Sequence, residues 1–441
     1  MSFSSSGRTS PSSKCSKDAN SSKWVVLGLL WLVCFLNYAD RQVISSLFPL
    51  LEHDFGFSKA QLGLIGSSFM WVYAFSSPLA GFAGDRVSRK GLILGGCLLW
   101  SVMTFFTGLC GKFWQFLATR AVIGLGESLY FPSATSLISG WHGLRTRSTA
   151  LSLHQSAVYV GTIAGGALGA YVGARYGWRW AFYGFGGAGI LVAILIRKHL
   201  ADPVIPSADL LKRDAETTMN TTATNGLIPT FQKLLTKPNV LLLMVAFAFA
   251  NGVAAIFLLW APTFLYEKFH QSLVVAGFSA VAAIQIASAV SAPLSGLLAD
   301  RLSIRIRGAR MIVQAVALLL GSLTIVAVGR AATMEALIAS MICFGICKGG
   351  YDAGIFASVF DLVLPGERSS VAGLMNTLGW IGGAVSAMMV GIFSTYGSGT
   401  PMERMSGVIV WSSVGYLVAA TLLLSARTLD DTKPAETLHL G

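Results

Sequence analysis

The stretch GFAGDRVSRK, at residues 81–90, is repeated in altered form as GLLADRLSIR at residues 296–305. Both copies follow an apolar run, and both keep an Asp-Arg pair with a further basic residue behind it. A second pair of segments repeats at nearly the same distance along the chain, as RSTALSLHQSAVYVG at 147–161 and RSSVAGLMNTLGWIG at 368–382. The doubled pattern therefore predicts two halves with related structures.

The composition indicates that both halves fold in a lipid bilayer. Hydrophobic residues make up 54% of the 441 residues and charged residues only 12%, with a mean hydropathy of +0.65, whereas soluble domains contain about 25% charged residues. A membrane-spanning helix needs about 20 mostly apolar residues. Twelve segments meet this requirement: 24–48, 60–84, 90–111, 113–139, 147–173, 178–196, 239–265, 272–299, 308–328, 333–360, 368–394 and 404–425. We therefore expect an all-α membrane protein with twelve transmembrane helices in two six-helix bundles.

Polar segments divide the chain into five parts. The Ser-rich segment 1–22 predicts a disordered cytosolic tail, because such a segment buries too little apolar surface to fold. The N-terminal bundle is expected at 23–196 and the C-terminal bundle at 239–426. The polar stretch 197–238 predicts a cytosolic linker between them, and 427–441 predicts a second cytosolic tail.

The positive charge of the chain indicates its orientation in the membrane. The formal net charge is +12, and most of the 32 Lys and Arg residues fall in the tails and in alternate connections between the expected helices. Cytoplasmic loops of membrane proteins carry an excess of Lys and Arg. We therefore place both termini in the cytosol and expect a multi-pass monomer in the plasma (inner) membrane. Nucleic-acid binding is not needed to explain the charge.

Several motifs resemble those of the major facilitator superfamily. The two Asp-Arg loops resemble its signature GxxxDRxxR[KR], and RAVIGLGE at 120–127 resembles its Arg-x-x-x-Gly-x-Gly motif. Within the superfamily, NYADR at 37–41 and the Arg-x6-Glu spacing of the fourth helix resemble two groups. One is the anion:cation symporter family, which carries sugar acids and other organic anions with protons. The other is the spinster family, associated with lysolipid and sphingolipid transport; the stretch WAPTFLYEKFHQSLVVAGF at 260–278 favours the symporters.

Two positions depart from the pattern that this resemblance implies. The fifth helix of many sugar-acid symporters reads SGQFVG, but here it is SAVYVG, with Val158 in place of Gln. The eleventh helix often has Asn after Gly, but here Trp380 follows. Both exchanges remove amide groups that would hold sugar hydroxyls. We therefore expect a substrate that is less hydroxylated or more apolar than a hexuronate.

Three basic residues lie inside the expected helices, away from the helix ends: Arg41, Arg120 and Lys348. Charge at the middle of a membrane is costly and is usually functional. Arg120 and Glu127 are seven residues apart, so they lie on one helix face about 10 Å apart, at a depth similar to that of Asp40 and Arg41. The second repeat places Lys348 at the position of Glu127, so we expect these two to face each other across the halves.

These residues define a candidate site in which cations bind an anion and carboxyl groups carry protons. We assign substrate binding to Tyr38, Arg41, Arg120, Lys348 and Trp380, and proton coupling to Asp40 and Glu127. Substrate and proton then change each other's affinity by the same factor. Two alternatives stay open: Asp40 and Arg120 form a purely structural ion pair, or Lys348 pairs only with Asp352, one turn along its helix.

The charged residues beside the doubled loops have a different expected role. They lie at helix ends, far from the middle of the membrane, so we predict gating contacts there and not substrate contacts. These residues are Asp85, Arg86 and Arg89 in the first half, and Asp300 and Arg301 in the second.

Together, these features predict a secondary active transporter that moves a small organic anion by alternating access with proton coupling. The alternative is a spinster-like transporter of a lysolipid or another amphiphile. The chain contains no Walker loop, GxSxG or HExxH motif, so we do not expect an enzyme, and the doubled gating loops suit alternating access better than an open channel. Its six cysteines form no CxxC pair, so we expect neither a metal nor a cofactor.

Overall fold

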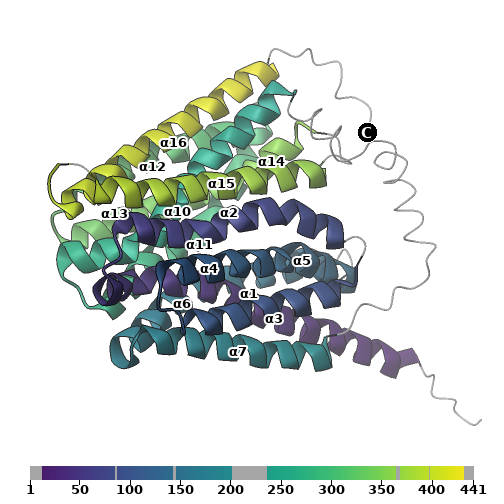
Figure 1. Cartoon of the computed structure of the whole chain (residues 1–441). Helices are drawn as coiled ribbons and strands as arrows, with labels where there is room; N and C mark the ends of the chain where they lie inside the picture. The colour runs from purple at the N-terminus through teal and green to yellow at the C-terminus, as the bar shows by residue number, and fades with distance from the viewer. Residues whose placement is uncertain are drawn as a thin grey trace, which may run out of the picture.

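The computed structural model describes residues 12–84, 87–142, 146–200, 236–363, 368–396 and 398–431, and every regular element within these ranges is an α-helix (Figure 1). The helices of the first half are α1 (Ser12–Phe55), α2 (Lys59–Gly84), α3 (Arg89–Thr107), α4 (Phe113–Ser128), α5 (Tyr130–Trp141), α6 (Arg147–Tyr176) and α7 (Trp178–His199). Those of the second half are α10 (Pro238–Phe269), α11 (Leu273–Ser303), α12 (Ala309–Arg330), α13 (Met334–Asp352), α14 (Ile355–Phe360), α15 (Arg368–Thr395) and α16 (Pro401–Asp431).

The number of membrane crossings matches the prediction of twelve. Eleven described segments are long and apolar enough to cross a membrane. The remaining crossing consists of α4 and α5 together, which are separated only by Leu129 and are 16 and 12 residues long. Leu129 keeps right-handed helical angles, so the chain direction continues. Helix α1 begins at Ser12, whereas the sequence predicts a tail up to residue 22.

The two halves also use equivalent glycines in helix packing, as the sequence repeat predicts. Gly124 lets α4 approach α2 closely, because a Cβ at this position would come within 2.5 Å of the Phe69 carbonyl oxygen. Gly345, the equivalent position of the second half, does the same for α13 against α11, where a Cβ would come within 2.6 Å of the Ile284 carbonyl oxygen. Small residues at such contacts let membrane helices pack backbone to backbone.

Two helix pairs join the halves: α2 packs against α15, and α6 packs against α11. Figure 1 shows α2 beside α15, where the earlier helices meet the later ones. Helices α1 and α10 also touch, and the Gln42 Nε2 donates a hydrogen bond of 2.8 Å to the Leu258 carbonyl oxygen. These contacts bring the polar residues of the first half next to those of the second.

The distal end of the bundle lies opposite to the start of α1 and the end of α16 (Figure 1). Charged side chains close this end. Lys59, at the start of α2, is only 5% exposed. Its ammonium forms ion pairs with Glu52 of α1, at 2.5 Å, and with Glu267 of α10. Nearby, the Ala60 backbone N–H donates to the Thr395 Oγ1 at 2.8 Å. The Glu267 and Thr395 contacts each link the two halves, so the distal end is held shut.

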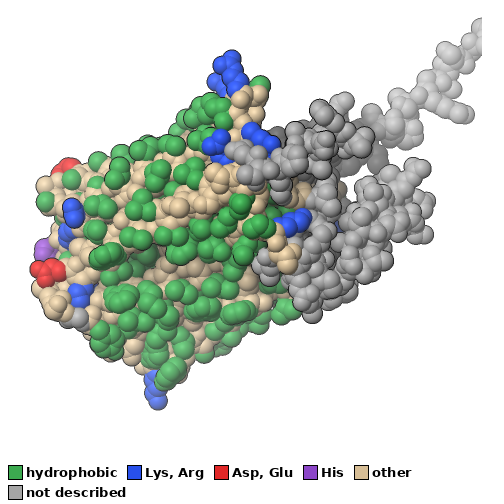
Figure 2. Space-filling model, turned by 90° about the horizontal axis from the view of Figure 1, so that it is seen from above, with side chains coloured by type: hydrophobic (Ala, Val, Ile, Leu, Met, Phe, Trp, Pro, Cys, Tyr) green, Lys and Arg blue, Asp and Glu red, His purple; other side chains and the backbone are tan. Residues whose placement is uncertain are grey.

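The surface between the two ends is apolar. Large exposed side chains such as Phe75, Leu191 and Leu323 point away from the bundle. Figure 2 shows hydrophobic side chains spread over the broad middle of the face in view. Contiguous apolar surface of this extent needs a partner, and here the partner is the hydrocarbon of the bilayer.

Candidate functional site

A cavity of about 320 Å³ lies between the halves and is lined by residues from both. All five residues assigned to substrate binding line its wall: Tyr38, Arg41, Arg120, Lys348 and Trp380. They come from α1, α4, α13 and α15. A cavity this size lies at the lower end of the range for small-molecule sites.

Arg41 is held between a carboxylate and a group of aromatic rings. Its guanidinium forms an ion pair with Glu127 of α4, whose side chain is fully buried, and the Arg41 side chain is 11% exposed. Four rings surround the guanidinium carbon, with centroids 4.5 to 5.2 Å away: Tyr38, Phe69, Tyr73 and Trp380. Such cation–π contacts stabilise a desolvated guanidinium.

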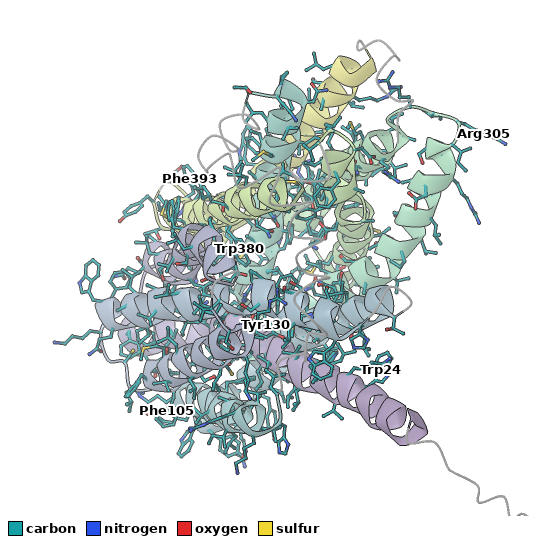
Figure 3. The ribbon with its side chains drawn as sticks, turned by 90° about the vertical axis from the view of Figure 1, so that its right-hand side faces the viewer. Trp24, Phe105, Tyr130, Arg305, Trp380 and Phe393 are labelled. Atoms are coloured by element: carbon teal, nitrogen blue, oxygen red, sulfur yellow. The ribbon has the colours of Figure 1, made fainter. Side chains whose placement is uncertain are left out.

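Trp380 connects these four rings, called the aromatic cage here, to the second half. It is carried by α15, and its ring packs 4.7 Å from that of Tyr73 and 5.9 Å from that of Phe69, both on α2. Figure 3 shows Trp380 where the two halves meet. A movement of α15 relative to α2 would therefore change the surroundings of Arg41.

Arg120 and Asp40 have incomplete polar contacts. Arg120 is 3% exposed, its guanidinium carbon lies 4.9 Å from the Phe69 ring centroid, and its Nε has no hydrogen-bond partner among the described residues. Asp40 is 2% exposed; the Thr104 Oγ1 donates to its Oδ2 at 3.4 Å, and its Oδ1 has no partner in the same ranges. No ion pair joins Arg120 to Asp40 in this described part of the chain. The geometry thus leaves a buried guanidinium on the cavity wall with a donor to spare.

Lys348 lies on the cavity wall but binds its own helix. Its ammonium pairs with the Asp352 carboxylate at 2.5 Å, one turn along α13. Lys348 and Glu127 therefore do not pair with each other here, because each has another partner. The alternative of a local pair is what the structure contains, although Asp352 lines the same cavity.

The predicted gating residues are only partly visible. Asp85 and Arg86 lie outside the described residues, and Arg89 is half-buried at the start of α3. In the second half Arg301 is exposed, whereas the Asp300 carboxylate accepts from the Arg310 Nη2 at 2.9 Å.

Arg310 also pairs with Asp361, at 2.6 Å, just after α14. The Asp300 carboxylate therefore belongs to a three-residue contact within the second half. No sequence motif selects Arg310 or Asp361, because the repeated motif ends before both of them.

Several residues of the site, which line the cavity or surround Arg41, were missed because they resemble ordinary core residues. Phe69 and Tyr73 are four apart, and so lie on one face of α2, but aromatic residues at that spacing are common in any apolar helix. Asn251 of α10 and Gln285 of α11 also line the cavity. A single amide in an otherwise apolar helix was the available signal for each, since buried polar groups need partners.

The fold, a cavity between pseudo-repeated halves and its buried cations define a membrane transporter. The chain belongs to the Major Facilitator Superfamily: residues 30–387 match the sequence profile of that family. It is thus a multi-pass integral membrane protein, and its relatives in this family are transporters. The twelve-helix prediction and the family assignment from the sequence are confirmed.

The relatives include both groups that the sequence resembles. The chain is 28% identical over 412 residues to "Probable anion transporter 4, chloroplastic" of Oryza sativa subsp. japonica, covering 91% of this chain and 67% of that protein. It is 24% identical over 431 residues to "Probable galactarate/D-glucarate transporter GudP" of Escherichia coli (strain K12), covering 92% and 93%. Among solved structures, a bacterial homologue of the human lysosomal transporter spinster superposes with a TM-score of 0.80 at 21% identity, covering 94% of this chain and 99% of that one, and this likeness concerns the fold.

Proposed function

We propose that this transporter moves a small organic anion across the membrane by alternating access, coupled to protons. The observation that carries the proposal is Arg120, a buried guanidinium on the cavity wall whose Nε has no partner among the described residues. A guanidinium fork matches a carboxylate. The names of the relatives, an anion transporter and a galactarate/D-glucarate transporter, support the same substrate class.

The charge balance around the cavity favours an anion with one negative charge. Arg41 and Lys348 are already paired with Glu127 and Asp352, which leaves Arg120 as the cation without an ion pair in the described ranges. Asp40 is buried behind the cavity wall and is not one of its lining residues. With one proton on Asp40 or Glu127 the cluster gains a single positive charge, and a monoanion neutralises it.

Coupling between proton and anion follows from competition for Arg41. A carboxylate bound in the cavity between Arg120 and Arg41 competes with Glu127 for the Arg41 guanidinium. Once displaced, the Glu127 carboxyl is free to take up a proton, and by linkage the protonated site binds the anion more tightly by the same factor. The plasma (inner) membrane, cytosolic termini and a monomeric state remain part of this proposal.

The competing substrate class is a lysolipid or another amphiphile. An amphiphile site needs an extended apolar wall for the acyl chain, whereas this cavity presents three cationic side chains and several amides. An acyl chain packed there would leave the Arg120 Nε and the Gln285 Oε1, which have no partner among the described residues, without hydrogen bonds, at about 1–3 kcal/mol each. The lining therefore favours the small anion.

Uptake into proteoliposomes tests the proposal. The purified protein would be assayed with lactate, glycerate, gluconate, glucarate and a lysophosphatidylcholine, with and without a pH gradient that is acidic outside. We expect uptake of at least one monocarboxylate that the gradient stimulates. Uptake of the lysolipid alone would reject the anion assignment, and anion uptake that ignores the gradient would reject the coupling.

A further inference from the structure

We propose that Gln285 of α11 accepts a hydrogen bond from a hydroxyl group of the bound anion, so that it supplies an amide contact where Val158 and Trp380 replace the amides of the fifth and eleventh helices. The inference rests on the proposed function and names a specificity residue within it. It also reverses the expectation, drawn from Val158 and Trp380, of a substrate with few hydroxyl groups.

Gln285 has the surroundings of a binding residue. It lines the central cavity, it is only 5% exposed, and its Oε1 has no hydrogen-bond partner among the described residues. A side-chain amide oxygen accepts hydrogen bonds, and a buried acceptor without a donor costs about 1–3 kcal/mol. A hydroxyl on a ligand in the cavity supplies the missing donor.

Gln42 shows how a structural glutamine on the same cavity differs. Its Nε2 donates to the Ser45 Oγ at 2.6 Å and to the Leu258 carbonyl oxygen at 2.8 Å. That amide holds α1 against α10 and has no need of a ligand. The contrast separates a glutamine engaged in helix packing from one whose oxygen remains available.

Asn251 of α10 places a side-chain amide next to the eleventh helix. It lines the cavity from α10, and its Nδ2 lies so close to Gly379 that a Cβ on that glycine would come within 2.5 Å of it. Gly379 directly precedes Trp380, the position at which the sugar-acid symporters that this chain resembles often carry Asn. An amide therefore lies beside the eleventh helix, but it comes from α10.

In this proposal, a charged group of the first half and an amide of the second half contact the same ligand. Arg120 of α4 takes the carboxylate, and Gln285 of α11 accepts from a hydroxyl elsewhere on the same molecule. The predicted ligand class is a monocarboxylate with at least one hydroxyl group. Because the two contacts come from opposite halves, such a ligand joins them, whereas an unsubstituted carboxylate lacks the contact with Gln285.

The test measures selectivity with matched pairs of probes. Binding of lactate and propionate, and of gluconate and hexanoate, would be measured on the purified full-length protein for wild type and Gln285→Met. Methionine has a similar length but neither accepts nor donates as an amide does. We expect wild type to prefer the hydroxylated member of at least one pair by about ten-fold, the equivalent of one hydrogen bond, and Gln285→Met to lose that preference while it still binds the other member.

A matched control is Gln314→Met, which changes a glutamine of the same half that is 1% exposed and donates to Ser358 on α14, away from the cavity. It should keep the wild-type preference. If Gln285→Met does not fold, Gln285→Asn keeps the amide but shortens its reach and should also lose the preference.

The outcomes separate this inference from the proposed function. An unchanged preference in the Gln285 variants overturns the inference and leaves anion transport standing. Equal loss of both members of a pair also overturns it, because Gln285 would then support the fold only. No binding of any carboxylate by wild type overturns the proposed function itself.

Discussion

Helices α4 and α13 occupy equivalent places in the two halves, yet their charged residues are used differently. Glu127 of α4 is fully buried, and its partner Arg41 comes from another helix. Lys348 holds the same position on α13, its side chain is 14% exposed, and its partner Asp352 is on the same helix and 41% exposed. Glycine contacts of the same kind, at Gly124 and Gly345, place both helices. One backbone frame therefore supports a fixed pair between helices in one half and a local pair facing the cavity in the other.

Because of this difference, the two ion pairs respond to different changes in the protein. The Arg41–Glu127 pair depends on how α1 and α4 sit, so a change in either helix or in the cavity alters it. The Lys348–Asp352 pair can open without any movement of helices. Removing one partner of a buried pair costs about 3–5 kcal/mol, whereas a local pair on a helix surface is worth about 0.2–0.5 kcal/mol. Substitutions at the two positions should therefore differ strongly in effect.

The largest effect is expected for Glu127→Gln. This change removes the charge that balances Arg41 and the proposed proton carrier, while it keeps the shape of the side chain. Proton-driven uptake should be lost, counterflow should survive better because it needs no net proton movement, and the melting temperature in detergent should fall. Glu335→Gln, at an exposed site on α13, is the control. Proton-driven uptake equal to wild type would exclude Glu127 from coupling.

Arg120→Lys should have the next largest effect. The charge is kept, but the planar fork that matches a carboxylate becomes a point charge. A hydrogen bond to a charged group is worth about 1.5–3 kcal/mol, so we expect anion affinity to fall on the order of ten-fold or more. Binding measured beside Arg330→Lys, an exposed position at the end of α12, checks this. Wild-type affinity would show that Arg120 is part of the scaffold.

Lys348→Ala should weaken anion binding by less than Arg120→Lys does. Because Asp352 already compensates the ammonium, a roughly three-fold loss is expected, equivalent to about 0.6 kcal/mol. Thermal stability should change little. Binding to the Arg120→Lys/Lys348→Ala double variant sharpens the comparison: wild-type affinity in both single variants and in the double variant would make all these charges scaffolding and favour the lipid transporter.

The smallest effect, of opposite sign, is expected for Asp352→Asn. Loss of this carboxylate releases the Lys348 ammonium to the cavity, so anion affinity should rise slightly, by less than about three-fold. Titration of the same anion against wild type measures it. A fall in affinity would mean that Asp352 itself contacts the ligand or positions Lys348 for it.

The sequence predicted the helices and the depth of the charges well, but not their partners. Apolar runs and the two repeats fix where a helix lies and how far along it a residue sits, which is why the five predicted substrate residues all reached one cavity. Pairing depends on how each helix is rotated. Asp40 and Arg41 are adjacent and so point in different directions, and hydropathy does not reveal that Arg41 would turn toward Glu127 and Asp40 toward Thr104.

The aromatic cage around Arg41 and the ion pairs at the distal end could not be predicted from the sequence, for other reasons. Aromatic residues such as Phe69 and Tyr73 occur in any apolar helix, and only their contact with Arg41 distinguishes these two from ordinary core residues. No role was expected for Lys59 or Glu267 from the sequence, and they meet because the start of α2 and the end of α10, from opposite halves, come together at the distal end. Contacts between halves require the relative placement of the bundles, which no local pattern contains.

The balance of charge at the centre has an electrical consequence. Three cationic side chains and three carboxyl groups gather there: Arg41, Arg120, Lys348, Asp40, Glu127 and Asp352. When all six are ionised their charges cancel, and with the proposed load of one proton and one monoanion they cancel again. The membrane voltage then acts on neither the empty nor the loaded site, although it would act on each uncompensated charge with about 2.3 kcal/mol per 100 mV. Transport of a monocarboxylate should therefore generate no current, and a dicarboxylate carried with a single proton should move negative charge in the direction of the substrate.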